Sequence, residues 1–259
     1  MKINDKKRAL IFIMSALLFL AVAIFFAYHQ SKEKYLDPRV RKAREYYNKY
    51  DKLVEENNYQ GILLVLDSIE MVYLSHPHYQ NSYEQGVVYN NRAATYISLA
   101  IHYPDSSLSL DGINLLSKDS LLSSAKKNIE SAIQYYKTWL EEFSTKEEDE
   151  IQRKIDESFL SGMNKYAPEE QQKFLQKRVE EYIEAQYETR RRLSVAYTNM
   201  GIISRHHEKY QKAIQLYEKA LTLWEHNLAA KNNLNILQGK PLEKRNFIER
   251  MFPPERQVE

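Results

Sequence analysis

The sequence predicts an all-α protein, with an N-terminal transmembrane helix followed by a solenoid of stacked helical hairpins. Three observations predict this fold class. Only 6 glycines and 7 prolines occur in 259 residues, of which 43% are hydrophobic. So few helix-breaking residues favour helices throughout. A long uncharged run lies near the N-terminus, and later stretches repeat apolar residues at steps of three and four, as helices with one buried face do.

The uncharged run covers residues 9–28 and predicts a transmembrane anchor. At about 1.5 Å per residue, it is long enough for a hydrocarbon core of roughly 30 Å. The alternative is a cleaved signal peptide, with Ala21 and Ala23 as the small residues at the cleavage site. The apolar run continues beyond Ala23, which favours an uncleaved, single-pass anchor.

Charges on both sides of the span bear on its orientation. The short N-terminal tail, residues 1–8, is basic, and Lys6, Lys7 and Arg8 adjoin the span directly. Basic residues also follow it in the predicted stalk, residues 29–42. Because charge next to the first span usually dominates, we expect the N-terminus in the cytoplasm. The chain is then a single-pass protein of the inner (cytoplasmic) membrane, with its main domain outside the cytoplasm.

The clearest helical pattern lies at residues 194–227. Small residues stand where two helices must approach closely, at Gly201, Ala213 and Ala220. The polar stretch 206–209 interrupts the apolar period and predicts a turn. One two-helix hairpin cannot bury its apolar face alone, so this stretch requires stacked neighbours.

Residues 194–227 resemble a tetratricopeptide repeat (TPR), a helix–turn–helix unit of about 34 residues. The positions that agree with its pattern are Ala196, Tyr197, Met200, Gly201, Tyr210, Ala213, Tyr217, Ala220 and Leu221. Two positions depart from it, because Ser204 replaces the usual aromatic and Glu225 stands where the family often has proline. The chain is thus similar to membrane-anchored TPR proteins of bacteria. The resemblance implies an α-solenoid, here expected over residues 43–239, that binds proteins.

Weaker copies of the same pattern precede and follow this repeat. The first is predicted at about 43–76, with Tyr46 as its first aromatic and a turn at 55–58. The second covers 86–143, with Ala93 in place of the glycine, an insertion at 104–120, and Asp119 or Ser120 as the N-cap of its second helix. Charged helical segments follow at 146–165 and 168–192. A polar capping helix at 228–239, for which Gly239 is a suitable C-terminal residue, and a tail at 240–259 complete the chain.

No residue pattern in the sequence predicts catalysis. The net charge of +2 gives no electrostatic footprint for nucleic acid, and there is no cysteine. His76 and His78, and His206 and His207, lack the helical spacing of a metal-binding pair. We therefore expect no enzyme activity, no catalytic residue, no cofactor, no metal and no small-molecule substrate.

TPR proteins bind peptides or partner helices in the concave groove lined by the first helix of each repeat. The residues that the resemblance places in this groove are Tyr47, Asn48, Asp51, Asn90, Ala94, Ile97, Thr198, Ile202 and Arg205. The family's lysine and asparagine clamp for a C-terminal carboxylate is absent, since those positions hold Tyr47, Asp51, Thr198 and Ile202. Any of the groove residues equally suits packing. The basic run 190–192 suits an acidic partner, lipid headgroups or a solvated helix face.

The predicted function is a membrane-tethered scaffold that holds partner proteins through the concave face of the solenoid. The alternative is a structural subunit or assembly factor of a larger membrane complex, whose span makes specific helix contacts. Small residues such as Ser15, Ala16 and Ala23 suit such contacts, but the span contains no G-x-x-x-G motif. This absence favours a plain tether.

Overall fold

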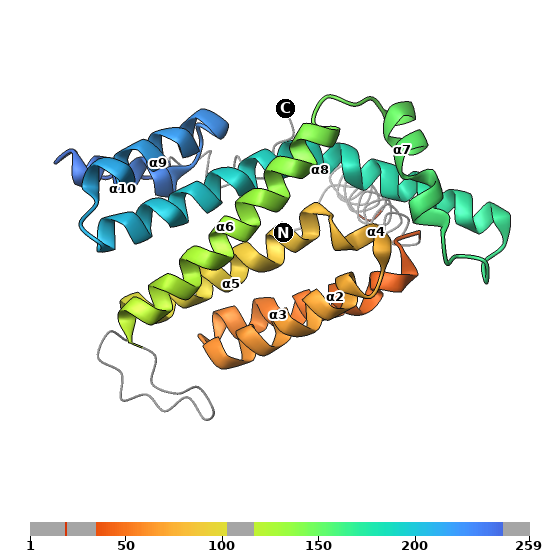
Figure 1. The fold of residues 1–259 in the computed structure, drawn as a ribbon, viewed down its shortest axis with the longest axis horizontal. Coiled ribbons are helices and arrows are strands. Elements are labelled where there is room, and N and C mark those ends of the chain that lie inside the picture. The colour runs from red at the N-terminus through yellow and green to blue at the C-terminus, as the bar shows by residue number, and fades with distance from the viewer. Residues whose placement is uncertain (1–18, 20–34, 103–116, 246–259) are drawn as a thin grey trace, which may run out of the picture.

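The computed structural model describes residues 19, 35–102 and 117–245, and the regular elements within them are all helices (Figure 1). The predicted tail 1–8, the span 9–28 apart from Phe19, most of the insertion 104–120 and the end of the chain from residue 246 lie outside these residues. Among the residues that the structure describes, no helix combines the length and the hydropathy needed to cross a bilayer. The all-α prediction is confirmed for the described chain.

The first hairpin joins α2 (Arg41–Glu55) to α3 (Tyr59–Leu74), with the turn where the sequence predicts it. Asn57 takes a positive φ of 53°, and the Asn58 side chain caps α3 by accepting from the Gly61 amide at 2.9 Å. A short 3-10 turn, η1 (Pro38–Val40), precedes α2. Val40 is buried in the core of this hairpin, so residues 37–40 of the predicted stalk belong to the folded domain.

The second hairpin follows the short helix α4 (Pro77–Gln80) and joins α5 (Tyr83–His102) to α6 (Lys118–Phe143). A Cβ atom added to Gly86 would lie 2.7 Å from Cδ1 of Tyr136 on α6. A Cβ on Gly201 would meet Tyr217 at the same distance. Gly86 therefore occupies the close approach that the sequence assigns to Ala93. The two positions differ by seven residues, which keeps both on the same helix face.

The start of α6 also differs from the prediction. Its N-cap is Ser117, whose hydroxyl accepts a hydrogen bond from the Ser120 amide at 3.2 Å. Asp119, one of the two predicted caps, lies in the first turn instead, where its negative charge suits the positive end of the helix dipole. The last residues of the predicted insertion, 117–120, are thus the beginning of α6.

The two charged segments after α6 form α7 (Glu148–Leu160) and α8 (Pro168–His206). The sequence predicts one segment at 168–192 and a separate repeat helix from 194, but α8 is one helix of 39 residues. No glycine or proline occurs between Pro168 and Gly201, and a buried stripe runs through Leu175, Tyr182 and Leu193. Nothing in this stretch ends the helix.

The third hairpin consists of the last turns of α8 and helix α9 (Tyr210–Leu223), and α10 (Leu228–Leu237) packs beside them. Glu208 has a positive φ of 58° in the turn, as Asn57 has in the first hairpin, and Gly239 has a φ of 65° after α10. The predicted C-terminal role of Gly239 is confirmed.

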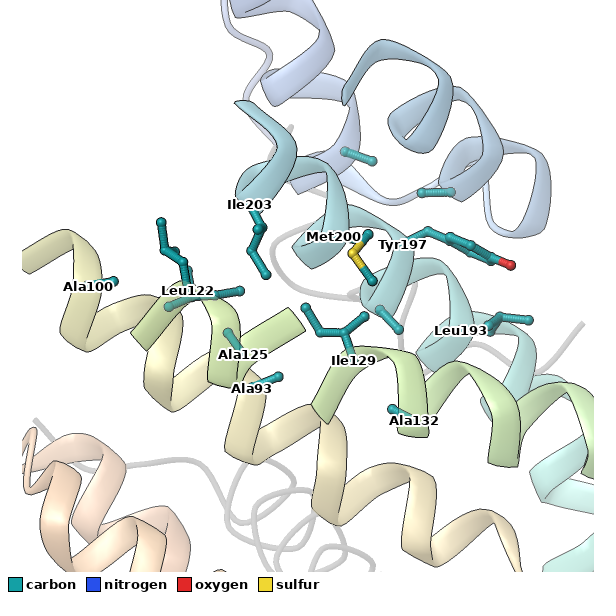
Figure 2. Packing of buried hydrophobic residues seen from close by; sticks show 14 of the residues in the cluster. Ala93, Ala100, Leu122, Ala125, Ile129, Ala132, Leu193, Tyr197, Met200 and Ile203 are labelled. Carbon is teal, nitrogen blue, oxygen red and sulfur yellow. The ribbon is translucent and has the colours of Figure 1, made fainter. Parts of the chain in front are cut away.

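Three groups of buried apolar residues hold the helices together. The largest joins α5, α6, α8, α9 and α10, and Figure 2 shows its small and large side chains meeting between α5, α6 and α8. A second lies between α6, α7 and the first half of α8. The third lies between α2, α3 and the start of α5. Because α6 and α8 each contribute to two groups, these two helices connect the parts of the domain.

Candidate partner-binding surface

The first helices of the three hairpins are α2, α5 and α8, and polar contacts join them. Arg44 on α2 donates to Glu181 on α8 at 2.7 Å. Asn199 on α8 donates to Asn90 on α5 at 3.3 Å. These contacts bring the three predicted lining helices together around α8, although the predicted groove residues do not all remain accessible.

The predicted residues divide into an accessible group and a covered group. Asn48 and Asp51 are exposed, and Tyr47, Ala94, Ile202 and Arg205 are half-buried. Asn90, Ile97 and Thr198 are buried, with at most 8% of their surface exposed. We use the name inner surface for these six accessible residues of the predicted groove, and the other three are buried packing residues.

Thr198 illustrates why burial changes the role of a predicted residue. Its hydroxyl donates to the Ser194 carbonyl at 3.0 Å and accepts from the Asn227 side chain at 3.0 Å. Asn227 also donates to the Ser194 hydroxyl at 2.8 Å, while its oxygen caps α10 through the Ala230 amide. Thr198 thus helps to fix α10 against α8 and presents no free hydroxyl to a ligand.

Tyr47 lies between two of the apolar groups, where its ring packs against residues of both. Its hydroxyl is buried and has no hydrogen-bond partner among the described residues. Burial raises the pKa of this hydroxyl well above its usual value, an effect that the charge of Arg192 opposes. The hydroxyl therefore stays protonated and can donate a hydrogen bond. The ring supports the fold and the buried hydroxyl is out of reach of a ligand, so Tyr47 acts mainly in packing.

Asn48 lines a small cleft of about 270 Å³ at the N-terminal end of α2, together with Leu36, Asp37, Arg41, Arg44 and Glu45. Two of its charged groups are already engaged, since Arg44 pairs with Glu181 and Asp37 pairs with Arg39. Arg41 and Asn48 are exposed. A guanidinium and an amide that line one cleft suit a carboxylate or a backbone carbonyl.

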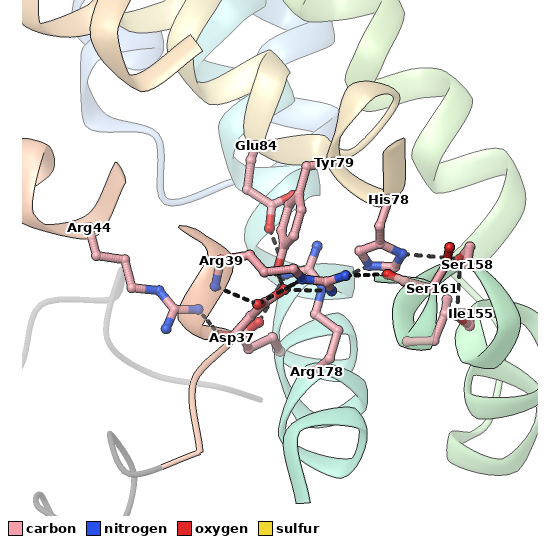
Figure 3. A network of polar contacts seen from close by, with 11 residues as sticks. Asp37, Arg39, Arg44, His78, Tyr79, Glu84, Ile155, Ser158, Ser161 and Arg178 are labelled. Carbon is pink, nitrogen blue, oxygen red and sulfur yellow. Dashed lines mark hydrogen bonds and ion pairs between the residues drawn. The ribbon is translucent and has the colours of Figure 1, made fainter. Parts of the chain in front are cut away.

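The sequence reasoning missed a buried polar network around Arg178 (Figure 3). Only 1% of the Arg178 side chain is exposed. It donates to Glu84 at 2.6 Å, to Glu181 at 2.9 Å and to Nε2 of His78 at 3.2 Å. Its guanidinium also lies 4.5 Å from the ring centre of Tyr79. The helical period marks position 178 as inward-facing, but it does not reveal which acids lie opposite.

The network extends to the segment that enters the domain from the predicted stalk. Arg39 pairs with Asp37 at 2.8 Å and donates to the Ser161 carbonyl at 2.8 Å, and the Tyr79 hydroxyl donates to Asp37 at 2.9 Å. Burial alone would raise the pKa of Asp37, but the hydrogen bond and charge of Arg39 outweigh it, so the pKa is lowered. Asp37 is therefore ionised near neutral pH, and the pair anchors the start of the domain.

Glu84 and His78 show that this network suits structure better than catalysis. Burial would raise the pKa of Glu84, but the Arg178 charge and hydrogen bond hold it below its usual value. Burial, with the charges of Arg178 and Arg39, lowers the pKa of His78 to about 2. A carboxylate and an imidazole held in single protonation states near pH 7 are poorly matched to proton transfer.

The basic run 190–192 is partly neutralised. Arg191 pairs with Glu188 at 2.7 Å and lies over the Trp224 ring, 5.7 Å from its centre. Arg192 approaches the same carboxylate at 3.7 Å, while Arg190 is exposed. In the part of the chain that the structure describes, no three His, Cys, Asp or Glu side chains are grouped to hold a metal ion.

Comparison with models of protein families, with curated proteins and with solved structures finds no match to this chain.

Proposed function

We propose that the chain is a single-pass protein of the inner membrane whose TPR-like solenoid binds partner proteins across its inner surface. The N-terminus is cytoplasmic and the solenoid lies outside the cytoplasm. The solenoid has no catalytic role and acts as a tethered scaffold. The partner contributes a peptide or a helix, held by the side chains of the inner surface.

One recurring turn is the observation that supports this proposal most. Helices α2, α8 and α10 end with the same backbone hydrogen bond. The Asn58 amide donates to the Leu53 carbonyl, the Lys209 amide to the Ser204 carbonyl, and the Lys240 amide to the Asn235 carbonyl, at 2.8–2.9 Å. Each bond spans five residues and follows a residue with positive φ. Such ends are common in helices generally, but here they close the two predicted first helices and the predicted capping helix, which supports a repeated hairpin.

A second supporting observation is the contrast between covered and accessible residues on the first helices. Stacking has buried Thr198 and Ile97, as the seams of a solenoid require, but leaves Asn48, Asp51 and Arg205 accessible to a partner. Accessible polar residues of both charges suit a hydrogen-bonded peptide more than an apolar ligand.

Site-specific photo-crosslinking in membranes tests the partner-binding role. A photoreactive residue at Asn48 or Arg205 is expected to capture the same protein, whereas one at Gln215, which is exposed on α9, captures none. Arg205→Ala and Asp51→Ala should weaken that crosslink from Asn48 without changing the melting temperature. Equal capture from all three positions, or capture unaffected by both variants, would reject the inner surface as the binding surface.

Cysteine labelling tests the topology, because the chain contains no cysteine. In intact cells, a membrane-impermeant maleimide should label Gln257→Cys and should not label Asn4→Cys. Labelling of Asn4→Cys alone would place the solenoid in the cytoplasm, and equal labelling of both would contradict a single-pass chain.

A further inference from the structure

A second cleft, which we call the α6 cleft, lies on α6 away from its buried stripe. Its volume is about 590 Å³, and its polar lining residues are Asn81 and, on α6, Lys127, Glu130, Ser131, Gln134 and Thr138. None of these residues belongs to the inner surface. The α6 cleft is therefore separate from the surface of the proposed function.

One aromatic ring, Tyr135, also lines the cleft, and its neighbours fix it in place. It stacks on Tyr89 of α5, with ring centres 5.7 Å apart and planes 12° apart. The Tyr89 hydroxyl donates to Glu70 of α3 at 2.7 Å. With one face covered by Tyr89, Tyr135 offers the cleft its other face and its edge.

Arg92 completes this support. Its guanidinium lies 5.5 Å from the centre of the Tyr89 ring and donates to Asp67 at 2.8 Å and to Glu70 at 2.7 Å. Only 10% of the Arg92 side chain is exposed. Helices α3 and α5 thus hold the Tyr135 ring of α6 in place through Tyr89. Because the ring is already ordered, little side-chain conformational entropy is lost when a ligand packs on it.

The length and chemistry of the α6 cleft indicate the kind of ligand. From Lys127 to Thr138, α6 advances roughly 16 Å, which matches about five residues of extended peptide. Asn81 and Gln134 carry amides that both donate and accept, as the backbone of an extended peptide requires. Gln134 already donates to Thr138 at 3.1 Å, which orients its oxygen for a donor of the ligand.

We propose that the α6 cleft binds an extended peptide segment of a partner protein. A proline or another apolar side chain of that segment packs on Tyr135, and its backbone pairs with the amides of Asn81 and Gln134. Lys127 places a positive charge at one end of the cleft, where Glu130 already pairs with Lys126 at 3.7 Å, so the segment carries an acidic side chain there. A short saccharide would fill only part of this length.

Selection from a library of short random linear peptides tests the proposal with the full chain. Enriched peptides should bind the wild type and the control Ser123→Arg equally. They should bind Thr138→Arg and Gln134→Arg about tenfold more weakly or worse, as expected when a central contact is blocked. Residues 123, 134 and 138 are exposed on α6, so these variants should keep the wild-type melting temperature.

Replacing the ring by Tyr135→Leu should weaken the same peptides, and proline or apolar residues should recur at one position among them. Three results would overturn the proposal. The selection could enrich no peptide, or the enriched peptides could bind Thr138→Arg and Gln134→Arg as well as they bind the wild type. The third result is binding of a glycan from a glycan panel in place of peptides, when Thr138→Arg abolishes that binding. Peptides blocked only by Arg205→Ala would belong to the inner surface and would equally count against the α6 cleft.

Discussion

At the scale of single residues, the close helix pairs depend on a glycine facing a tyrosine. Gly86 faces Tyr136 and Gly201 faces Tyr217, and both tyrosine rings are completely buried. In each pair, the ring occupies the volume that a side chain would fill on the opposite helix. The same solution in two hairpins explains why helix-disfavouring glycine is present inside α5 and α8.

Gly201→Ala and Gly86→Ala are therefore expected to destabilise the protein. Alanine favours helix by about 1 kcal/mol over glycine, but a Cβ at either position would overlap a buried ring, and over-packing typically costs about 1–3 kcal/mol. Urea unfolding should give a lower free energy of unfolding for both variants. Ser123→Ala, on the exposed face of α6, is the control and should not destabilise. Unchanged stability of the glycine variants would show that the tyrosine rings move aside freely.

His78 is the residue whose titration should be visible in the stability of the protein. Its ring lies against Arg178, Arg39 and Ser158, and its folded-state pKa of about 2 is far below 6.5. Below about pH 6.5 the unfolded chain binds a proton that the folded chain excludes, so stability falls as the pH falls. One such proton contributes at most about 1.4 kcal/mol per pH unit.

His78→Gln should flatten the fall in stability between about pH 7 and pH 5. Urea unfolding of the wild type, His78→Gln and the exposed control His102→Gln over this range measures it. Some slope should remain, because burial and nearby Lys118 and Arg205 also lower the pKa of His206. Parallel curves for the wild type and His78→Gln would contradict the inferred protonation state.

At the scale of elements, α8 is the helix that sets the arrangement of the others. Its first half packs with α6 and α7, and its second half packs with α5, α9 and α10. Glu181 and Arg178 in its first half hold α2 and α5. A break in the middle of α8 would therefore loosen the packing between the two halves of the domain, which α6 also joins, while a break at its start would not.

Arg190→Pro tests this role, because Arg190 is exposed and lies in the interior of α8. Proline there removes a backbone hydrogen bond and kinks the helix, at a cost of about 3 kcal/mol or more. Thermal unfolding should begin at a lower temperature or separate into two transitions. Glu169→Pro, in the first turn of α8, should be tolerated because that amide lacks a helical partner. Equal effects of the two substitutions would argue against α8 as the connecting helix.

At the scale of the whole molecule, the described domain begins before its first long helix. Asp37 and Arg39 reach Tyr79 on α4 and the carbonyl that follows α7, so the segment next to the predicted anchor contacts distant parts of the chain. The ring of Tyr35 also meets Phe174 on α8, with ring centres 6.3 Å apart. Residues 35–40 are thus docked on the domain and are not a loose linker.

A chain of residues 35–245 should be strongly helical by circular dichroism. One of residues 41–245 should melt at a lower temperature, because it lacks Asp37, Arg39 and Val40 and leaves Tyr79 without its buried partner. Asp37→Asn in the longer chain is the matched variant and should lie between the two. A melting temperature that does not depend on residues 35–40 would return them to the role of a simple stalk.

The sequence by itself determined the all-α class, the hairpins at both ends of the domain and their turns. These features are local. The apolar period of 59–74 or 210–223 is complete within one helix, and polar turns such as 206–209 interrupt it visibly. Helix ends were predicted well where a polar turn or a glycine such as Gly239 marks them, and less well at Ser117, where neighbouring polar residues are equivalent as caps.

Only the tertiary structure decided which residues of a shared face meet. Gly86 and Ala93 lie on the same face of α5. The position of Tyr136 along α6 places its ring against Gly86. Thr198 and Ile97 fit the predicted groove by spacing, but α10 and the core cover them. Arg178 is paired with Glu84, 94 residues away. Periodicity reports the direction of a side chain from its own helix, whereas burial and pairing depend on the partner helix, whose register and distance are set by packing.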